Sequence, residues 1–417
     1  MHHFQYQGNE LYAEEVPLKE IVATVGSPVY VYSHATLTRH FKAFDDAFTG
    51  VPHTICYSVK ANSNLAVLKT FVKLGGGVDI VSGGELYRAL QAGADPKKVV
   101  YSGVGKKDDE IEYALNTGIL MFNVESEQEL TRISEIASRT GKKAGIAIRV
   151  NPDVDPGTHP YITTGLKNAK FGITIDKAIA EYKRAKDLPG IEILGIDCHI
   201  GSQLTKVAPF VDSIKKLKNV IAALREMGIN PQYFDIGGGL GIQYNEEEPP
   251  LPADYGKEIV AETKDLGMHL VFEPGRNIVG NAGILVAKCL FTKERDEKNF
   301  IMIDAGMNDL ARPALYSSFH GVQPVVKDQD GMIVADIVGP ICESGDFLVK
   351  DREVPMFRQG DLMAFMSAGA YGFAMSSTYN SRPRVAEVMV QGNQFEVVRE
   401  REKVEDLIRG ERVPSFL

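Results

Sequence analysis

Two kinds of segment alternate between residues 54 and 274, and this alternation restricts the fold more than any other feature of the 417-residue sequence. In one kind, such as ELYRALQAG, apolar residues recur every three or four positions, which is typical of amphipathic helices. The other kind consists of eight short β-rich runs: TICYSV, GVDIVS, VVYSG, ILMFNV, AGIAIRV, LGIDCHI, YFDIGG and LVFEPG. Eight parallel strands with helical crossovers over about 250 residues match a (β/α)8 TIM barrel. An open doubly wound sheet is the alternative interpretation.

The pattern changes after Gly283. Five runs follow, with turn residues between them and little helical periodicity: ILVAKCLF, FIMIDAG, GMIVADIVG, DLMAFMS and RVAEVMVQG. Such a pattern predicts a C-terminal antiparallel β domain. Before the barrel, SPVYVYS reads as one more strand that joins this domain. We therefore expect a barrel over residues 34–283 and a β domain made of residues 1–33 and 284–417. The longest predicted loop of the barrel region spans residues 151–172, where prolines and glycines exclude a continuous helix.

Composition and charge exclude several functional classes. Hydrophobic residues make up 44% and charged residues 24% of the sequence, as in ordinary folded proteins. The net charge is −9 and no basic block is present, so we expect no nucleic-acid partner. The N-terminus lacks a basic start followed by an apolar run, and the longest uncharged stretch, residues 362–381, is too polar for a membrane span. We expect no membrane role. The four cysteines are scattered without CxxC spacing, which favours reduced thiols and a cytoplasmic location.

The informative positions follow each predicted strand, because barrel active sites form at the C-terminal ends of the strands. Lys60 follows the first run, where desolvation by an apolar barrel wall would keep its amine neutral and able to form a Schiff base. The alternative is an ordinary solvated lysine. Asp79 in the second run suits either a site role or the capping of a helix that begins near SGGELYRAL. His199 in the sixth run suits a structural role or a metal ligand, but no second histidine lies near it at ligand spacing, so we expect no metal.

Two glycine-containing loops, GGGLG (237–241) and EPGR (273–276), follow the seventh and eighth runs. Barrels of this kind commonly bind phosphate there, although bare turns are the alternative. A dinucleotide fingerprint is excluded because Ile242 stands where its last glycine belongs. Glu273, inside the barrel mouth, is expected to need a cationic partner. A lysine amine, a phosphate site, a histidine and an acid for a ring nitrogen together indicate a pyridoxal phosphate site.

The sequence resembles the diaminopimelate decarboxylases, a family of barrel-type pyridoxal phosphate enzymes with the alanine-racemase-like fold. The resemblance covers nearly the whole chain, and it is carried by YSVKAN (57–62), VDIVSGGE (78–85), HIGSQ (199–203), DIGGGLG (235–241), EPGR (273–276), RPALY (312–316), CESGD (342–346) and GAYG (369–372). Several of these motifs are shared with ornithine and arginine decarboxylases. The combination of RPALY with CESGD is more discriminating.

The resemblance implies roles for individual residues. Lys60 is implied to bind pyridoxal 5'-phosphate covalently, His199 to stack on its ring, and Glu273 to contact its ring nitrogen. The other expected cofactor contacts are Asp79, Ser202, Gly238, Gly239, Pro274, Gly275, Arg276 and Tyr371. The expected substrate contacts are Arg276, Arg312, Tyr316, Glu343 and Tyr371, and Cys342 is the implied proton donor. In this family the counterparts of Cys342 and Glu343 reach the site from the neighbouring subunit, which implies a homodimer with shared active sites.

The activity implied by the resemblance is decarboxylation of meso-2,6-diaminopimelate to L-lysine and CO2, the last step of lysine biosynthesis. This substrate carries a second carboxylate and ammonium far from the reacting carbon, and arginines, a phenol and a carboxylate suit their recognition. Ornithine offers no distal carboxylate to Arg312. The alternatives are an ornithine, arginine or carboxynorspermidine decarboxylase of the same fold and, from another class, a noncatalytic pyridoxal phosphate-binding protein.

Overall fold

The structure is a computed structural model that describes residues 2–155, 157, 164–165, 169–296 and 298–417. The chain forms two compact units. The first unit contains residues 1–37, 244–246 and 279–417, and the second contains residues 38–243 and 247–278. The second unit is therefore continuous in sequence apart from one short excursion, whereas the first is assembled from both ends of the chain.

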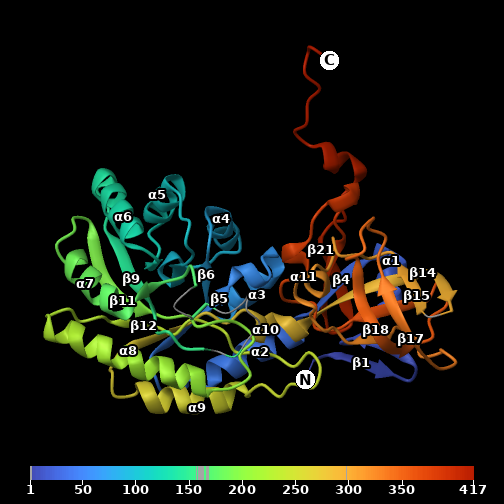
Figure 1. Ribbon diagram of the computed structural model, residues 1–417, viewed down its shortest axis with the longest axis horizontal. Coiled ribbons are helices and arrows are strands. Elements are labelled where there is room, and N and C mark those ends of the chain that lie inside the picture. The colour runs from blue at the N-terminus through green and yellow to red at the C-terminus, as the bar shows by residue number, and fades with distance from the viewer. Residues whose placement is uncertain (1, 156, 158–163, 166–168, 297) are drawn as a thin grey trace. The chain divides into compact units, whose positions relative to one another are not determined.

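The second unit is a closed barrel with eight parallel strands in its ring, and the two-residue strand β10 (Ile173–Thr174) pairs with one of them, β9, within the described residues (Figure 1). Their order around the barrel is β5 (His53–Ser58), β6 (Gly77–Ile80), β7 (Val99–Tyr101), β8 (Met121–Val124), β9 (Ala144–Asn151), β11 (Ile191–Asp197), β12 (Tyr233–Asp235) and β13 (His269–Phe272). Pairing of β13 with β5 and of β8 with β9 closes the ring. The predicted barrel is confirmed, and the open-sheet alternative is wrong.

Helices connect these strands and lie outside them (Figure 1). They are α3 (Leu65–Lys73), α4 (Gly83–Gln91), α5 (Asp108–Thr117), α6 (Glu127–Thr140), α7 (Ile175–Ala185), α8 (Ala208–Glu226) and α9 (Pro252–Thr263). α2 (His34–Asp46) precedes β5, and the short α10 (Arg276–Val279) follows β13. α6 shows how the sequence sets these bounds. The Ser126 side chain caps its first turn by accepting from the Glu129 N–H, and Gly141 ends it in a left-handed conformation.

The barrel interior is built in two layers that follow from the two-residue period of a strand. Five buried apolar side chains from different strands form the lower layer: Cys56, Val100, Met121, Ala147 and Val271. Side chains two positions further along a strand point to the same face. The residues two positions after these five are Ser58, Ser102, Asn123, Arg149 and Glu273, all of them buried. An apolar floor therefore carries a polar layer toward the C-terminal ends of the strands.

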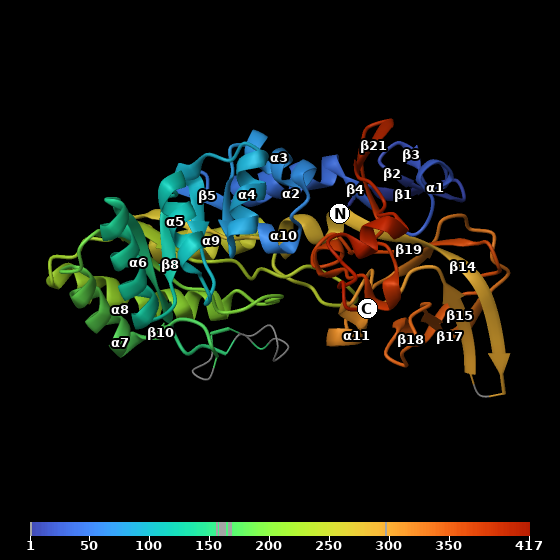
Figure 2. The same cartoon turned by 90° about the horizontal axis from the view of Figure 1, so that it is seen from above.

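The first unit contains two sheets within its described residues. A small antiparallel sheet consists of β1 (Phe4–Gln7), β2 (Glu10–Ala13) and β3 (Val16–Pro17), followed by α1 (Leu18–Val25). The larger sheet has the order β18 (Phe347–Pro355), β17 (Met332–Val338), β15 (Lys298–Ile303), β14 (Gly283–Arg295), β4 (Val29–Ser33), β20 (Ala386–Gln391) and β21 (Gln394–Arg399). β19 (Leu362–Phe365) pairs with β14 and with β16 (Val322–Pro324). Figure 2 shows β14 and β15 running side by side as a long hairpin.

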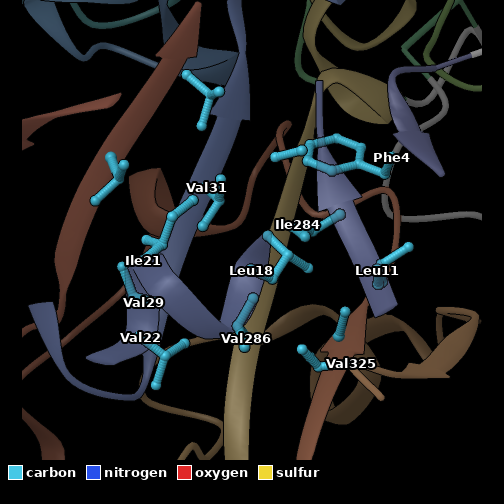
Figure 3. Packing of buried hydrophobic residues seen from close by; sticks show 14 of the residues in the cluster. Phe4, Leu11, Leu18, Ile21, Val22, Val29, Val31, Ile284, Val286 and Val325 are labelled. Atoms are coloured by element: carbon cyan, nitrogen blue, oxygen red, sulfur yellow. The ribbon is translucent and has the colours of Figure 1, made fainter. Parts of the chain in front are cut away.

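Apolar side chains from both ends of the chain share the core of the first unit. Phe4, Leu11, Leu18 and Ile21 come from the N-terminal segment and pack in one cluster with residues of β4 and β14 (Figure 3). Val29 and Val31 of β4 are completely buried in that cluster. The predicted joining of the N-terminal strand to the C-terminal domain is thus confirmed.

The large sheet is not purely antiparallel. β4 runs parallel to β20, and β15 runs parallel to β17. Neither pair is joined by a hairpin, so the connection leaves the relative direction of the strands open. Of the predicted loop 151–172, residues 156, 158–163 and 166–168 lie outside the described residues. None of the helices in the described ranges combines the length and apolar character that a membrane span requires.

Candidate active site

Lys60 lies at the C-terminal end of β5 and forms an ion pair with Asp79. Its Nζ is 2.5 Å from Asp79 Oδ2, and the Asp79 side chain is completely buried. The Ser58 hydroxyl donates to the same oxygen at 2.8 Å. Asp79 does not cap α4, because Ser82 accepts the Glu85 N–H at that helix start. Of the two interpretations of Asp79, the structure therefore supports a side chain directed at the lysine.

Glu273 is buried just after β13, and its partners are neutral. Its Oε1 accepts from the Ser102 hydroxyl at 3.0 Å and from Asn123 Nδ2 at 3.1 Å. Glu273 forms no ion pair with another of the described residues, so its expected cationic partner, the ring nitrogen of the cofactor, stays a prediction. The buried Arg149 instead pairs with Glu125 at 2.8 Å. Burial and the nearby carboxyl groups of Asp235 and Asp79 raise the pKa of Glu273 well above its usual range, which favours its neutral form.

Two further buried carboxyl groups lie beside Glu273. Oxygen atoms of Asp197, Asp235 and Glu273 lie within 4.8 Å of one another, a spacing that suits shared protons or a bound cation. Asn123 bridges two of them, because its Nδ2 also donates to Asp235 Oδ2 at 3.0 Å. Burial, followed by the charge of Asp197, raises the pKa of Asp235 to about 8. Burial also raises the pKa of Asp197 well above its usual range, so the cluster holds protons at neutral pH.

His199 and Gly238 contact each other across neighbouring loops. The Gly238 N–H donates to His199 Nδ1 at 3.0 Å, so this ring nitrogen carries no proton. Burial, followed by the positive charges of Arg149 and Lys60, lowers the pKa of His199 well below its usual range, and the ring is neutral at pH 7. A Cβ at Gly238 would lie 2.1 Å from the Glu273 carbonyl oxygen, so only glycine fits between these loops. At Gly239, φ is +116° and a Cβ would meet the Gly201 carbonyl at 2.5 Å.

Ser202 and Arg276 bring a hydroxyl and a guanidinium to the same group of loops. Arg276 is buried at the start of α10, directly after Glu273, Pro274 and Gly275. Its Nη2 donates to Ser202 Oγ at 3.2 Å. A cationic donor beside a hydroxyl on glycine-containing loops suits an anion such as phosphate.

Arg312 and Tyr316 lie on one short helix of the first unit, α11 (Arg312–Tyr316). They are four positions apart and so lie on one side of that helix. Arg312 is buried, and its Nη1 is 2.9 Å from Nε2 of His320, which is also buried. The guanidinium carbon lies 4.4 Å from the centre of the Tyr244 ring, close enough for a cation–π contact. His320 and Tyr244 were not predicted as site residues.

The loop after β17 carries Cys342 and Glu343 on the surface of the first unit. Cys342 is exposed, whereas Cys56, Cys198 and Cys289 are buried, and none of the four is in a disulfide. The Cys342 N–H donates to Asn380 Oδ1 at 2.7 Å, and the Tyr379 hydroxyl is hydrogen-bonded to Glu343. An exposed thiol does not fit the usual role of a lone cysteine as a small core residue. Tyr371, also of the first unit, follows β19 with a φ of +56°.

The structure brings the predicted residues together in two sets. The barrel brings together Lys60, Asp79, His199, Ser202, Gly238, Gly239, Glu273, Pro274, Gly275 and Arg276, and the first unit carries Arg312, Tyr316, Cys342, Glu343 and Tyr371. Sequence reasoning missed Asn123, Asp197 and Asp235 in the barrel. Their signal was available, because each is a polar residue within an otherwise apolar predicted strand.

The barrel residues fit pyridoxal phosphate. They offer a primary amine at the mouth, a buried carboxyl for a ring nitrogen, and an arginine with a hydroxyl for a phosphate. Asp79 Oδ1 and Asp197 Oδ1 are buried without a hydrogen-bond partner among the described residues, which is costly for a site that contains only these protein groups. A cationic or hydrogen-bonding ligand in this layer would relieve that cost.

Comparisons with known proteins agree with this chemistry. The family profile described as pyridoxal-dependent decarboxylase, pyridoxal binding domain, matches residues 34–280. A diaminopimelate decarboxylase of Vibrio cholerae is 52% identical over 409 residues, with 98% of each chain covered. A crystal structure of diaminopimelate decarboxylase from M. jannaschii has a TM-score of 0.95 and 36% identity, covering 100% of this chain and 99% of that one.

A second solved structure adds a bound ligand. The diaminopimelate decarboxylase of Helicobacter pylori, complexed with L-lysine, has a TM-score of 0.91 and 41% identity, covering 94% of this chain and 98% of that one. Identity of this extent over nearly the whole length of both chains is far beyond a shared fold. This chain therefore belongs to the pyridoxal-dependent decarboxylases and, among them, to the diaminopimelate decarboxylase family.

Proposed function

We propose that this protein decarboxylates meso-2,6-diaminopimelate to L-lysine and CO2, using pyridoxal 5'-phosphate. The observation that carries the proposal is the Lys60–Asp79 pair in a barrel that also holds three buried carboxyl groups close together, in a chain of this family. When bound, the cofactor supplies an electron sink for the carbanion that remains after loss of CO2. The barrel, residues 34–283, would hold the cofactor, and residues 1–33 and 284–417 would contribute substrate and interface residues.

The barrel residues would divide the work of holding the cofactor. Lys60 would attach it covalently, and Asp79 would keep the lysine oriented. The neutral His199 would lie against the ring without adding charge. The raised pKa of Glu273 favours a protonated carboxyl group, which would share its proton with the ring nitrogen and so strengthen the electron sink. The phosphate would be held by Ser202, Gly238, Gly239, Gly275, Arg276 and Tyr371, with Pro274 shaping the loop.

The distal end of the substrate explains the remaining residues. Arg276 and Arg312, with the phenols of Tyr316 and Tyr371, would bind its carboxylate, and Glu343 would receive its ammonium. Cys342 would donate the proton that replaces the lost carboxyl group, and its exposed thiol supports access to a substrate. The product, L-lysine, keeps the distal carboxylate and would therefore bind to the same two arginines, Arg276 and Arg312.

The decisive measurement is product formation by the purified protein with added pyridoxal phosphate. We expect CO2 and L-lysine in equal amounts from meso-diaminopimelate. Ornithine lacks the distal carboxylate and so loses a buried charge pair worth about 2 kcal/mol or more. Its kcat/KM should therefore be lower by a factor of at least about 30. Faster turnover of ornithine, arginine or carboxynorspermidine would refute the substrate assignment. Cofactor binding without any turnover would refute the enzyme assignment.

We also propose a cytoplasmic homodimer in which Cys342 and Glu343 complete the site of the partner subunit. The exposure of both residues supports this proposal. Lys60→Ala and Cys342→Ala proteins, each inactive alone, are mixed and allowed to exchange subunits. About half of the dimers are then mixed, each with one intact site, so about one quarter of wild-type activity returns. If mass spectrometry demonstrates exchange and no activity returns, the shared site is wrong.

A further inference from the structure

We infer that His320 is a positioning residue for substrate selection, which holds the Arg312 guanidinium in the orientation that receives the distal carboxylate. The inference rests on the proposed function and extends it to a residue that does not touch the substrate. His320 and Arg312 are both buried in the first unit, 0% and 5% exposed. Their contact joins Arg312 Nη1 and His320 Nε2 over 2.9 Å.

The hydrogen bonds of His320 leave only one arrangement of its protons. Nδ1 lies 2.8 Å from the Met366 carbonyl oxygen, which can only accept, so Nδ1 carries the proton. The guanidinium can only donate, so Nε2 accepts from Arg312. The ring is therefore neutral, and its two nitrogens tie the guanidinium to the backbone of residue 366.

Other contacts fix the plane of the guanidinium. Its carbon lies 4.4 Å from the centre of the Tyr244 ring, and that ring meets His320 edge-on at 5.6 Å between centroids. Arg312 Nη2 also donates to the Ser318 hydroxyl at 3.3 Å. Recognition of a carboxylate through two parallel hydrogen bonds requires such a fixed plane.

The chemical nature of the acceptor matters as much as its position. An aspartate or glutamate at position 320 would form its own ion pair with Arg312 and compete with the substrate carboxylate. A neutral imidazole orients the guanidinium and leaves its positive charge in place. His320 thus fixes the direction of a binding arginine without placing a negative charge beside it.

The test compares His320→Gln with His320→Met, two side chains of nearly equal size. Gln places an acceptor oxygen close to the position of Nε2, whereas Met offers only a weak sulfur acceptor. Loss of a hydrogen bond to a charged group predicts that His320→Met raises the KM for meso-diaminopimelate about tenfold or more. His320→Gln should recover most of that affinity, and kcat should change less than KM in both variants. The inhibition constant of L-lysine should follow the KM, while that of cadaverine, which lacks a carboxylate, should not.

Controls separate this inference from the proposed function. Arg312→Lys, measured in parallel, should raise the same KM. His53 also contacts a backbone carbonyl, with its Nδ1 2.8 Å from the Val51 oxygen. His53→Met removes this contact and should leave the KM unchanged. An inactive wild type would refute the proposed function. A different result would overturn only the inference: the wild type is active and Arg312→Lys raises the KM, but His320→Gln and His320→Met have equal KM values. If His320→Met does not fold, His320→Asn, which reaches the Met366 carbonyl but not Arg312, replaces it under the same criterion.

Discussion

The buried carboxyl cluster predicts an unusual dependence of stability on pH, which Asp235→Asn should reduce. The pKa of Asp235 is about 8 in the folded protein and about 4 in an unfolded chain. Between these values the folded state keeps a proton that the unfolded state has lost. The free energy of unfolding therefore falls as pH rises, by about 1.4 kcal/mol per pH unit for each such group. The stabilising effect is fully present below the unfolded value and is lost as pH rises to the folded one.

The magnitude of the variant's effect follows from the same slope. Asparagine has nearly the shape of aspartic acid and cannot ionise. At about pH 6 the folded Asp235→Asn protein therefore holds at least one titratable proton fewer than the folded wild type. From pH 5.5 to 7.5, Asp235→Asn should gain about 3 kcal/mol of unfolding free energy relative to wild type. The side-chain oxygen of Asn123 has no hydrogen-bond partner among the described residues, and turning its amide would offer that acceptor to the new amide at position 235.

The assay is urea denaturation of the cofactor-free protein, followed by circular dichroism at pH 5.5, 6.5 and 7.5. The difference between variant and wild type cancels the titration of the groups that do not interact with Asp235. Asp265→Asn is the matched control, because the pKa of this exposed carboxyl is lowered by Lys218 and it stays ionised across the whole range. Parallel pH dependences for wild type and Asp235→Asn would refute the buried protons, whereas the Asp265→Asn curve should run parallel to wild type.

Three further predictions concern the site residues. Lys60→Ala should fold, because Ser58 still donates a hydrogen bond to Asp79. It should lose the visible absorbance of bound cofactor and nearly all turnover. A variant that keeps both activity and a borohydride-reducible cofactor linkage would contradict the role of Lys60. Arg312→Ala should raise the KM for meso-diaminopimelate about 30-fold or more and leave inhibition by cadaverine unchanged, so an unaltered KM contradicts its assignment. Gly238→Ala forces a Cβ to 2.1 Å from a backbone oxygen and should weaken cofactor binding at least about tenfold in an absorbance titration, whereas Gly84→Ala, with its nearest contact at 3.7 Å, should bind normally.

The barrel was predictable because each of its strands is a short apolar run between helical segments. The β domain was only partly predictable. β18 has the sequence FLVKDREVP, in which charged residues interrupt the apolar pattern, and its place at the sheet edge explains why it tolerates them. β21 is similarly polar and also lies at an edge. Strand direction depended on pairings between distant segments, which local sequence does not encode.

The candidate site was also only partly predictable from the sequence. Residues at strand ends could be found from position alone, as for Lys60 and Glu273. The partners of Glu273 could not be found in this way, because Ser102 follows β7 and Asn123 lies in β8. The two-residue period would have placed both beside Glu273 once the barrel register was known. His320 gave no signal, since its contact with Arg312 depends on how the chain turns between α11 and β16.

The position of β4 has a consequence for how the protein is made. β4 is synthesised early, but both of its neighbours, β14 and β20, leave the ribosome only after the entire barrel. Because folding proceeds from the N-terminus during synthesis, the barrel can close while the apolar strand Val29–Ser33 still has no sheet to join. That strand must then be kept from pairing with other nascent chains until synthesis is nearly complete. A fragment that begins at residue 279 would lack this central strand and expose the edges of β14 and β20, so we expect it to aggregate rather than fold.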